Sequence, residues 1–436
     1  MNATDPVDEA VRAALTYADP IGRIVVAYSG GLDSTVLLHA VAALVGVRHR
    51  LFALHVNHGI SRNADAWQRH CESVGAKLGV QVETRRVVVA SGASLEAAAR
   101  RARYGAFAEV LDTEDVLWLA HHLDDQAETV LWRLMRGGGS AALAGMPAAR
   151  RLGRGQLLRP LLNVARTDIA AWARSHDVRW IDDDSNSDRR HERNFIRHDV
   201  LPVLQRRWPD AASRLHHAAL RFADEAAALK RTLDVQLDVA CVGSGELPLA
   251  ALSDAHARPL LRRWLERQGV AGVRERVLTE ILRQARGAED RIPQVVVADG
   301  ISVRRFAQHL HVVADTSIRY DDVQWILGST LTLPIGQLDS RRVNEIGLCA
   351  TLSSVEVRPR RGGERLNPAG RDGSRSVKRL LQEAHVPPWR RAAYPLIYVG
   401  DRLAAVPGVA VDAAFADTSG DAWRLTPTWA DRHIRA

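Results

Sequence analysis

Residues 25–38 read Val25-Val26-Ala27-Tyr28-Ser29-Gly30-Gly31-Leu32-Asp33-Ser34-Thr35-Val36-Leu37-Leu38, so an apolar run meets a glycine-rich turn and a second apolar stretch. The pattern predicts a strand over Arg23–Tyr28, a turn, and a helix that begins at about Ser34. The two glycines allow positive φ angles and a close approach of the backbone to a ligand. Ser34 is a candidate N-cap, and the N–H groups at a helix start attract anions. The stretch predicts an anion site, unless the glycines serve only a tight turn.

The alternation of strand and helix continues beyond this stretch. Each of the next three apolar runs is followed by a helical pattern. Such alternation predicts an α/β fold, with a doubly wound, Rossmann-like parallel sheet and helices on both faces. Ligands of such sheets bind beyond the carboxyl ends of the strands. The further predicted strands are Leu51–Val56, Val82–Val89 and Val116–Ala120, and the helices after them begin near Asp65, Ser94 and Asp124.

Two more regions follow the α/β region. We expect a catalytic domain over residues 1–212, a mostly helical middle domain over 213–340, and a small α+β domain over 341–436. The Ala-rich stretch Ala211–Leu237 predicts a long helix, and Gln294–Val297 predicts a short strand.

The composition is that of an ordinary globular protein. The 436 residues are 46% hydrophobic and 25% charged, with a net charge of +8, which excludes a disordered polymer, a collagen-like repeat and a membrane bundle. The polar segment Met1–Ala10 shows no secretory signal, so we expect a cytoplasmic protein that does not bind membranes. The three cysteines, Cys71, Cys241 and Cys349, lie far apart, which disfavours a zinc knuckle, a redox pair and a disulfide framework.

A Walker A phosphate loop is absent from the sequence. That loop needs a Gly-Lys pair followed by Ser or Thr. The three lysines, Lys77, Lys230 and Lys378, are followed by Leu or Arg instead. If the protein uses a nucleoside triphosphate, a different sequence motif must bind it.

Residues 29–34 resemble the PP-loop pattern Ser-Gly-Gly-x-Asp-Ser of the N-type ATP pyrophosphatases, which cleave ATP between the α and β phosphates. Further motifs, taken in order, resemble the tRNA(Ile)-lysidine synthetase family of that superfamily, in its long form with a C-terminal domain. The resemblance covers residues 20–210 and 355–410, whereas residues 215–345 carry no matching motif. The further motifs are Leu54–Ser61, Glu96–Tyr104, Ala120–Thr129, Arg136–Gly139, Gly145-Met146, Trp180–Asn186, Arg193–Arg197, Arg361–Leu366 and Pro387–Arg391.

The resemblance implies a ligase with ATP as cosubstrate and Mg²⁺ as its companion ion. In this family AMP is transferred onto the C2 oxygen of the wobble cytidine of tRNA(Ile) with anticodon CAU. The side-chain amine of lysine then displaces AMP, and the codon read changes from AUG to AUA. The implied partners are that tRNA and free L-lysine, and a homodimer is left open.

The resemblance also assigns roles to single residues. Asp33 is expected to help place Mg²⁺, although no set of metal ligands can be named. Asp125 and Glu128 lie three apart, on one helix face, and are expected to face the lysine ammonium; the alternative is that they are ordinary acids at a helix start. Arg103 is expected near the pocket, and Arg193 is expected to stabilise the charge of adenylation. The ATP loop is Ser29, Gly30, Gly31, Leu32, Asp33 and Ser34.

Two other readings stay open: another PP-loop tRNA-modifying enzyme, such as a tRNA thiolase, and a non-catalytic RNA-binding protein on the same fold. Thiolases depend on catalytic cysteines, and Cys71 lies on a predicted helix away from every motif. The intact loop and both acids disfavour a non-catalytic protein. His121 and His122 precede the acids, but no third ligand keeps the spacing of a metal site.

Basic residues cluster near the C-terminus. Residues 358–391 hold ten basic and three acidic residues, a net charge of +7. Clustered positive charge suits a polyanion, because many phosphates must be met together. The segment therefore predicts tRNA binding, and the resemblance implies the acceptor arm.

Overall fold

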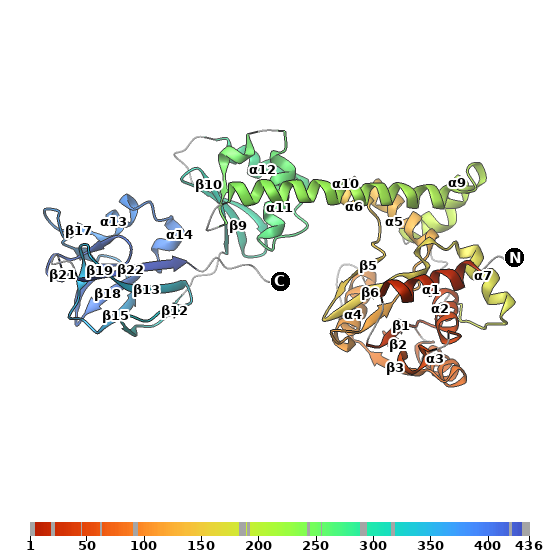
Figure 1. Ribbon diagram of the computed structural model, residues 1–436. Coiled ribbons are helices and arrows are strands. Elements are labelled where there is room, and N and C mark those ends of the chain that lie inside the picture. Colours follow the sequence, from red (N-terminus) through yellow and green to blue (C-terminus); the bar gives the residue numbers. More distant parts are fainter. Residues whose placement is uncertain are drawn as a thin grey trace. The chain divides into compact units, whose positions relative to one another are not determined.

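The computed structural model forms two compact units, residues Met1–Leu229 and Lys230–Ala436, each described by itself below (Figure 1). Part of the Trp180–Asn186 motif, including Asp183 and Asp184, lies outside the described residues. The structure describes residues 5–18, 22–44, 46–61, 63–89, 95–182, 189, 192–241, 245–253, 255–287, 294–314, 319–417 and 421–429.

The first unit is built on a six-stranded sheet with the strand order β3-β2-β1-β4-β6-β5. All neighbouring strands pair in parallel except β5 and β6, which form an antiparallel hairpin. The predicted parallel sheet is confirmed, but the hairpin was not predicted, because its Arg- and Gly-containing strands show no apolar run. The strands are β1 (Ile24–Ala27), β2 (Leu51–Asn57), β3 (Gln81–Arg86), β4 (Val116–Trp118), β5 (Ala149–Leu152) and β6 (Gly155–Leu158).

Helices cover both faces of this sheet, as the alternation of apolar residues in β1 shows. Ile24 and Val26 pack into a core with residues of α1, α2, α3 and α7, whereas Val25 packs into a second core with residues of α4. The helices of the unit are α1 (Pro6–Ala18), α2 (Leu32–Ala42), α3 (Ala64–Leu78), α4 (Leu95–Val110), α5 (Leu123–Met135), α6 (Ser140–Leu143), α7 (Arg166–Ser175), α8 (Glu192–Phe195), the π-helical segment η4 (Ile196–Val200) and α9 (Leu201–Arg207). The long helix α10 (Ala211–Ala240) begins in this unit and ends in the second.

The second unit begins with two helices and an antiparallel sheet of the order β7-β10-β9-β8. Leu260, Trp264 and Leu278 of the helices are buried in one core with Val303 and Leu310 of the sheet. The expected helices are present, and the sheet accompanies them. These elements are β7 (Leu247–Pro248), α11 (Ala257–Arg267), α12 (Glu275–Ala285), β8 (Gln294–Ala298), β9 (Ile301–Phe306) and β10 (His309–Ala314).

The rest of the second unit has two five-stranded sheets, β11-β15-β18-β19-β20 and β12-β13-β22-β14-β21, and a β16-β17 hairpin. The expected α+β character is confirmed. Its strands are β11 (Val323–Ile326), β12 (Leu331–Leu333), β13 (Gly336–Val343), β14 (Gly347–Cys349), β15 (Ser354–Pro359), β16 (Arg365–Leu366), β17 (Arg375–Ser376), β18 (Pro395–Val399), β19 (Arg402–Val406), β20 (Ala410–Val411), β21 (Ala416–Asp417) and β22 (Ala422–Trp429), and its helices are α13 (Val377–Glu383) and α14 (Pro388–Arg391).

The predicted domain boundaries stay predictions, and β13 bears on one of them. The boundary at residue 340 falls inside this strand, which pairs with β22 along its whole length. A cut meant to separate the C-terminal domain is therefore better made before β11. Within the described residues, no helix is both long and apolar enough to cross a bilayer.

Candidate functional site

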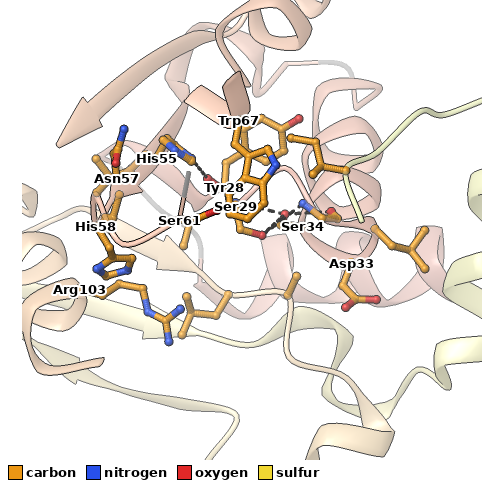
Figure 2. Close-up of a pocket in the computed structure, with 18 of the residues that line it drawn as sticks. Tyr28, Ser29, Asp33, Ser34, His55, Asn57, His58, Ser61, Trp67 and Arg103 are labelled. Atoms are coloured by element: carbon orange, nitrogen blue, oxygen red, sulfur yellow. Dashed lines mark hydrogen bonds between the residues drawn. The ribbon is translucent and has the colours of Figure 1, made fainter. Parts of the chain in front are cut away.

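A cavity of about 770 Å³ opens at the carboxyl ends of β1, β2 and β4. This is where a parallel sheet is expected to bind its ligand. Figure 2 shows Ser29, Asp33 and Ser34 on one side of this cavity and His58 and Arg103 on another. The cavity therefore brings the β1–α2 turn together with α4 and with the segment that follows β2.

The β1–α2 turn has the geometry of an anion cradle. Gly30 has a φ of +86°, and a Cβ there would lie 3.0 Å from Ile181 and 3.1 Å from Cys71. The positive φ favours glycine, and a Cβ would make tight contacts with both side chains. The N-cap of α2 is Gly31, which offers no side chain to the first N–H groups of the helix. Those N–H groups and the helix dipole favour an anion.

The prediction that Ser34 caps this helix is wrong. The helix begins at Leu32, so Ser34 lies within its first turn. The Ser34 hydroxyl donates to the carbonyl of Gly31 at 3.1 Å and accepts from the N–H of Ser29 at 3.2 Å. Ser34 therefore closes the turn on itself, and this leaves the helix start open to a ligand.

Asp33 stands at the edge of this cradle. Its side chain is 32% exposed and lies 3.6 Å from Nε2 of His122. Its Oδ1 atom is buried and has no hydrogen-bond partner among the described residues. A buried carboxylate oxygen without a partner suits a cation or a donor that arrives with the ligand.

The start of α5 supplies a second acidic group. His122 caps this helix: its ring accepts from the N–H of Asp125 at 3.4 Å, and Asp125 accepts from the N–H of His122 at 3.1 Å. Asp125 lines the cavity, whereas Glu128 does not and is almost fully buried. The expectation that both acids lie together is met, but only Asp125 reaches the cavity wall.

Arg197 of η4 binds both acids. Its guanidinium donates to Glu128 at 2.5 and 3.1 Å and to Asp125 at 2.8 Å. Burial raises the pKa of Glu128 above its ordinary value although Arg197 opposes this. Burial also tends to raise the pKa of Asp125. The nearby His122, His121 and Arg197 outweigh this effect, so the pKa of Asp125 is lowered. The acids are therefore held beside a resident cation.

His122 connects the two acidic groups. Its ring is buried, which opposes a charge, but Asp125, Asp33 and Asp124 raise the pKa of His122 above its ordinary value. His121 behaves in the opposite way. Its burial, with Arg159 nearby, lowers the pKa of His121 to about 3, so that ring is neutral and accepts from Arg159 at 3.1 Å. Among the described residues, no group of three acidic, His or Cys side chains has a metal-binding arrangement.

The two predicted arginines lie in different places. Arg103 lines the cavity from α4. Arg193 does not line the cavity; its guanidinium carbon lies 5.7 Å from the ring centroid of Trp132. The structure therefore brings Arg103 to the site and does not bring Arg193, whose role in adenylation stays a prediction.

The functional residue that sequence reasoning missed is Arg197. It ends the quoted Arg193–Arg197 motif, so a signal was present, but Arg193 was chosen. The four-residue spacing places both arginines on one face of this helical segment. Only the contact with α5 shows which of them meets the acids.

The basic segment 358–391 is less positive in the structure than in the sequence. Acids from inside and outside the segment neutralise several of its arginines, and two of these acids, Asp322 and Glu356, precede it in the chain. The pairs are Arg358 with Glu356 at 2.6 Å, Arg361 with Asp322 at 2.8 Å, Arg371 with Glu383 at 3.0 Å and Arg379 with Glu383 at 2.9 Å.

The fold and the motif at the start of α2 define a class of protein, the α/β proteins with a PP-loop domain. A family model described as a PP-loop domain matches residues 7–204. Models described as the TilS substrate binding domain and the TilS substrate C-terminal domain match residues 247–311 and 355–426.

Curated relatives narrow the class to one family. The tRNA(Ile)-lysidine synthase of Xanthomonas campestris pv. campestris (strain 8004) is 43% identical, over 90% of this chain and 92% of that protein. Those of Coxiella burnetii and Alkalilimnicola ehrlichii are 36% and 40% identical, over 91% and 94% of this chain and 91% and 95% of those proteins. The chain belongs to the tRNA(Ile)-lysidine synthase family, a family of ATP-using ligases, as its motifs predicted.

Proposed function

We propose that the chain ligates lysine onto C2 of the wobble cytidine of tRNA(Ile) with anticodon CAU and converts ATP to AMP and pyrophosphate. The observation that carries the proposal is a single cavity that joins a PP-loop turn to an acidic group at the start of α5. The reaction needs both, because one site must hold the nucleotide and the other must hold an ammonium group. Membership in the family supports the choice of substrates.

The reaction has two steps. In the first, O2 of the cytosine attacks the α-phosphorus of ATP, and pyrophosphate leaves with the electron pair of the broken P–O bond. In the second, the deprotonated side-chain amine of lysine attacks C2, the C2–O2 bond breaks, and AMP leaves with that oxygen while the nitrogen loses a proton. The product, lysidine, pairs with A rather than G, so the codon read changes from AUG to AUA.

The phosphates of ATP suit the open helix start and the positive-φ backbone of Gly30. Mg²⁺ fits the same place, because Asp33 offers a buried carboxylate oxygen with no hydrogen-bond partner among the described residues. When bound, the ion supplies charge neutralisation for the phosphates. Arg103, on the cavity wall, suits the charge that develops during AMP transfer.

The lysine ammonium suits Asp125, the acid that faces the cavity. Glu128 acts on Asp125 indirectly, because it binds the Arg197 guanidinium that also contacts Asp125. The basic surface of the C-terminal region is proposed to bind the acceptor arm of the tRNA. We place the reaction in the cytoplasm, where tRNA and free lysine occur together.

The test is incubation of the chain with ATP, lysine and a tRNA(Ile) transcript, followed by nucleoside mass analysis. We expect cytidine to gain the mass of one lysine less one water. The matched control is the same transcript with uridine at the wobble position, which should stay unmodified. A sulfur-containing nucleoside would favour a thiolase instead, and tRNA binding without pyrophosphate release would favour a non-catalytic protein.

A further inference from the structure

His122 lies between the two acids that the proposed reaction needs, and the steps above give it no role. Its side chain is 1% exposed, and its Nε2 atom lies 3.6 Å from Oδ2 of Asp33 and 3.4 Å from Oδ2 of Asp125. Asp33 belongs to the nucleotide loop after β1, and Asp125 belongs to the helix after β4. One buried ring, which does not itself line the cavity, therefore lies between the two acids.

The two ring nitrogens of His122 have different surroundings. Nδ1 accepts the N–H of Asp125 and so caps α5. A ring nitrogen that accepts a hydrogen bond carries no proton, so the ring proton lies on Nε2. Nε2 forms no hydrogen bond with the described residues, and the carboxylates of Asp33 and Asp125 lie 3.6 and 3.4 Å from it. Nδ1 therefore caps the helix, whereas Nε2 lies between the two carboxylates.

His122 belongs to a longer chain in which carboxylates alternate with side chains that carry N–H groups. Asp33, His122, Asp125, Arg197 and Glu128 follow one another, with separations of 3.6, 3.4, 2.8 and 2.5 Å. Without the Nε2–H group, Arg197 would still offset part of the charge of Asp33 and Asp125, but no donor would remain at the position of Nε2. Like charges repel, so the loop and the helix would be held less firmly in register.

We propose that His122 is a positioning residue that keeps the nucleotide loop in register with the lysine site, through its Nε2–H group between Asp33 and Asp125. This rests on the proposed function, in which AMP transfer and lysine attack take place at the same C2–O2 group. Reacting atoms must lie within about 3–3.5 Å of each other, and a misplacement of about 1 Å costs on the order of a hundredfold in rate.

Two substitutions separate the tasks of the ring. His122→Asn places its amide near the position of Nδ1, so it keeps the cap of α5 but does not reach Asp33. His122→Gln is longer and places an N–H donor near the position of Nε2, but it loses the cap. We expect His122→Asn to lower kcat by about ten- to a hundredfold with KM for ATP and for lysine within about twofold of the wild type.

We expect His122→Gln to have a lower Tm than His122→Asn and yet a higher kcat. A ring that only caps α5 requires the reverse order of kcat, and that result would overturn the proposal. If His122→Asn does not fold, His122→Gln is compared with His122→Ala; equal kcat values would overturn the proposal as well. His216→Asn, which changes a buried histidine of α10 outside the cavity, is the control and should leave kcat unchanged.

The wild-type assay keeps the two proposals apart. Lysidine formation by the wild type tests the proposed function alone. The order of kcat among the His122 variants, measured by release of pyrophosphate and by lysidine formed, tests only the positioning role.

Discussion

The acidic cluster of the cavity and the basic segment near the C-terminus are both built from Arg–carboxylate pairs, but they differ in burial. The side chains of Glu128 and Arg197 are 4% and 25% exposed, whereas those of Glu383 and Arg371 are 39% and 60% exposed. Removal of one partner from a buried pair leaves an uncompensated charge, which costs about 3–5 kcal/mol. Exposed pairs contribute little and can exchange partners. The first cluster therefore fixes a geometry, whereas the second holds its arginines less firmly.

The largest expected effect is on the activity of the cavity. Asp33→Ala should lower tRNA-dependent pyrophosphate release by at least about a thousandfold, because it removes the carboxylate beside the expected phosphates. The Tm should stay near that of the wild type, since Asp33 is partly exposed. Asp65→Ala, at the first turn of the neighbouring helix α3, is the matched control and should remain active. Normal pyrophosphate release by folded Asp33→Ala would remove Asp33 from the site.

The second prediction compares the two kinds of pair directly. Arg197→Ala should lower the free energy of unfolding by about 3–5 kcal/mol, because Glu128 and Asp125 would lose their shared cation. Arg371→Ala should leave the stability almost unchanged, because its pair with Glu383 is exposed. Urea unfolding of both variants makes the measurement. An equal loss of unfolding free energy in the two variants would mean that burial does not make the first pair more stabilising than the second.

The difference between the regions also explains what the sequence could predict. Asp125 and Glu128 were found together because they lie one turn apart on a single helix, and the PP-loop was found because it is one continuous stretch. Arg197 lies 69 residues beyond Glu128, and no local spacing selects it over Arg193. Only the packing of η4 against α5 decides between them.

The same limit applies to the fold and to the charge of residues 358–391. The parallel strands β1 to β4 were predicted from apolar runs, whereas the β5–β6 hairpin has no such run. Counting charges from residue 358 onward omitted Glu356, two residues earlier in β15, and Asp322, which the antiparallel pairing of β11 with β15 brings beside the segment. Pairs formed across sheets cannot be read from a window of sequence.

A third prediction sharpens the role of the acids. Asp125→Asn should raise KM for lysine by about ten- to a hundredfold, because the neutral amide keeps the shape but loses the charge that we propose faces the ammonium. Glu128→Gln should have a smaller effect, since Glu128 acts through Arg197 and does not line the cavity. In both variants the adenylated tRNA should accumulate, which nuclease digestion and mass analysis detect. An unchanged KM in Asp125→Asn would refute the assignment.

The fourth prediction concerns pH. The pKa of Asp125 is lowered from 3.8 in the folded state, so the stability that it contributes is present above about pH 3.8 and is lost as the pH falls through the folded value. The pKa of Glu128 is raised from 4.5, so its effect on stability has the opposite sign. Below about pH 3.8, the loss of stability on acidification should be smaller in Asp125→Asn than in the wild type, and Glu128→Gln should lack the gain of stability that the wild type shows as the pH falls toward 4.5. Urea unfolding at several pH values measures both slopes, and equal slopes in the two variants would contradict the prediction.

The smallest expected effect tests whether exposed pairs govern tRNA binding. Lys378 is exposed on α13 and forms no ion pair with the described residues, whereas Arg379 beside it is held by Glu383 at 2.9 Å. Each phosphate contact contributes close to one unit to the slope of log K against log salt. Lys378→Ala should therefore weaken tRNA binding and reduce that slope by about one. Arg379→Ala should reduce it by less, because its charge is already shared with a carboxylate. Titrations of tRNA at several salt concentrations give both slopes. If Arg379→Ala flattens the slope as much as Lys378→Ala does, carboxylate pairing does not restrain the arginines, and the ion pairs of this surface open freely to phosphate.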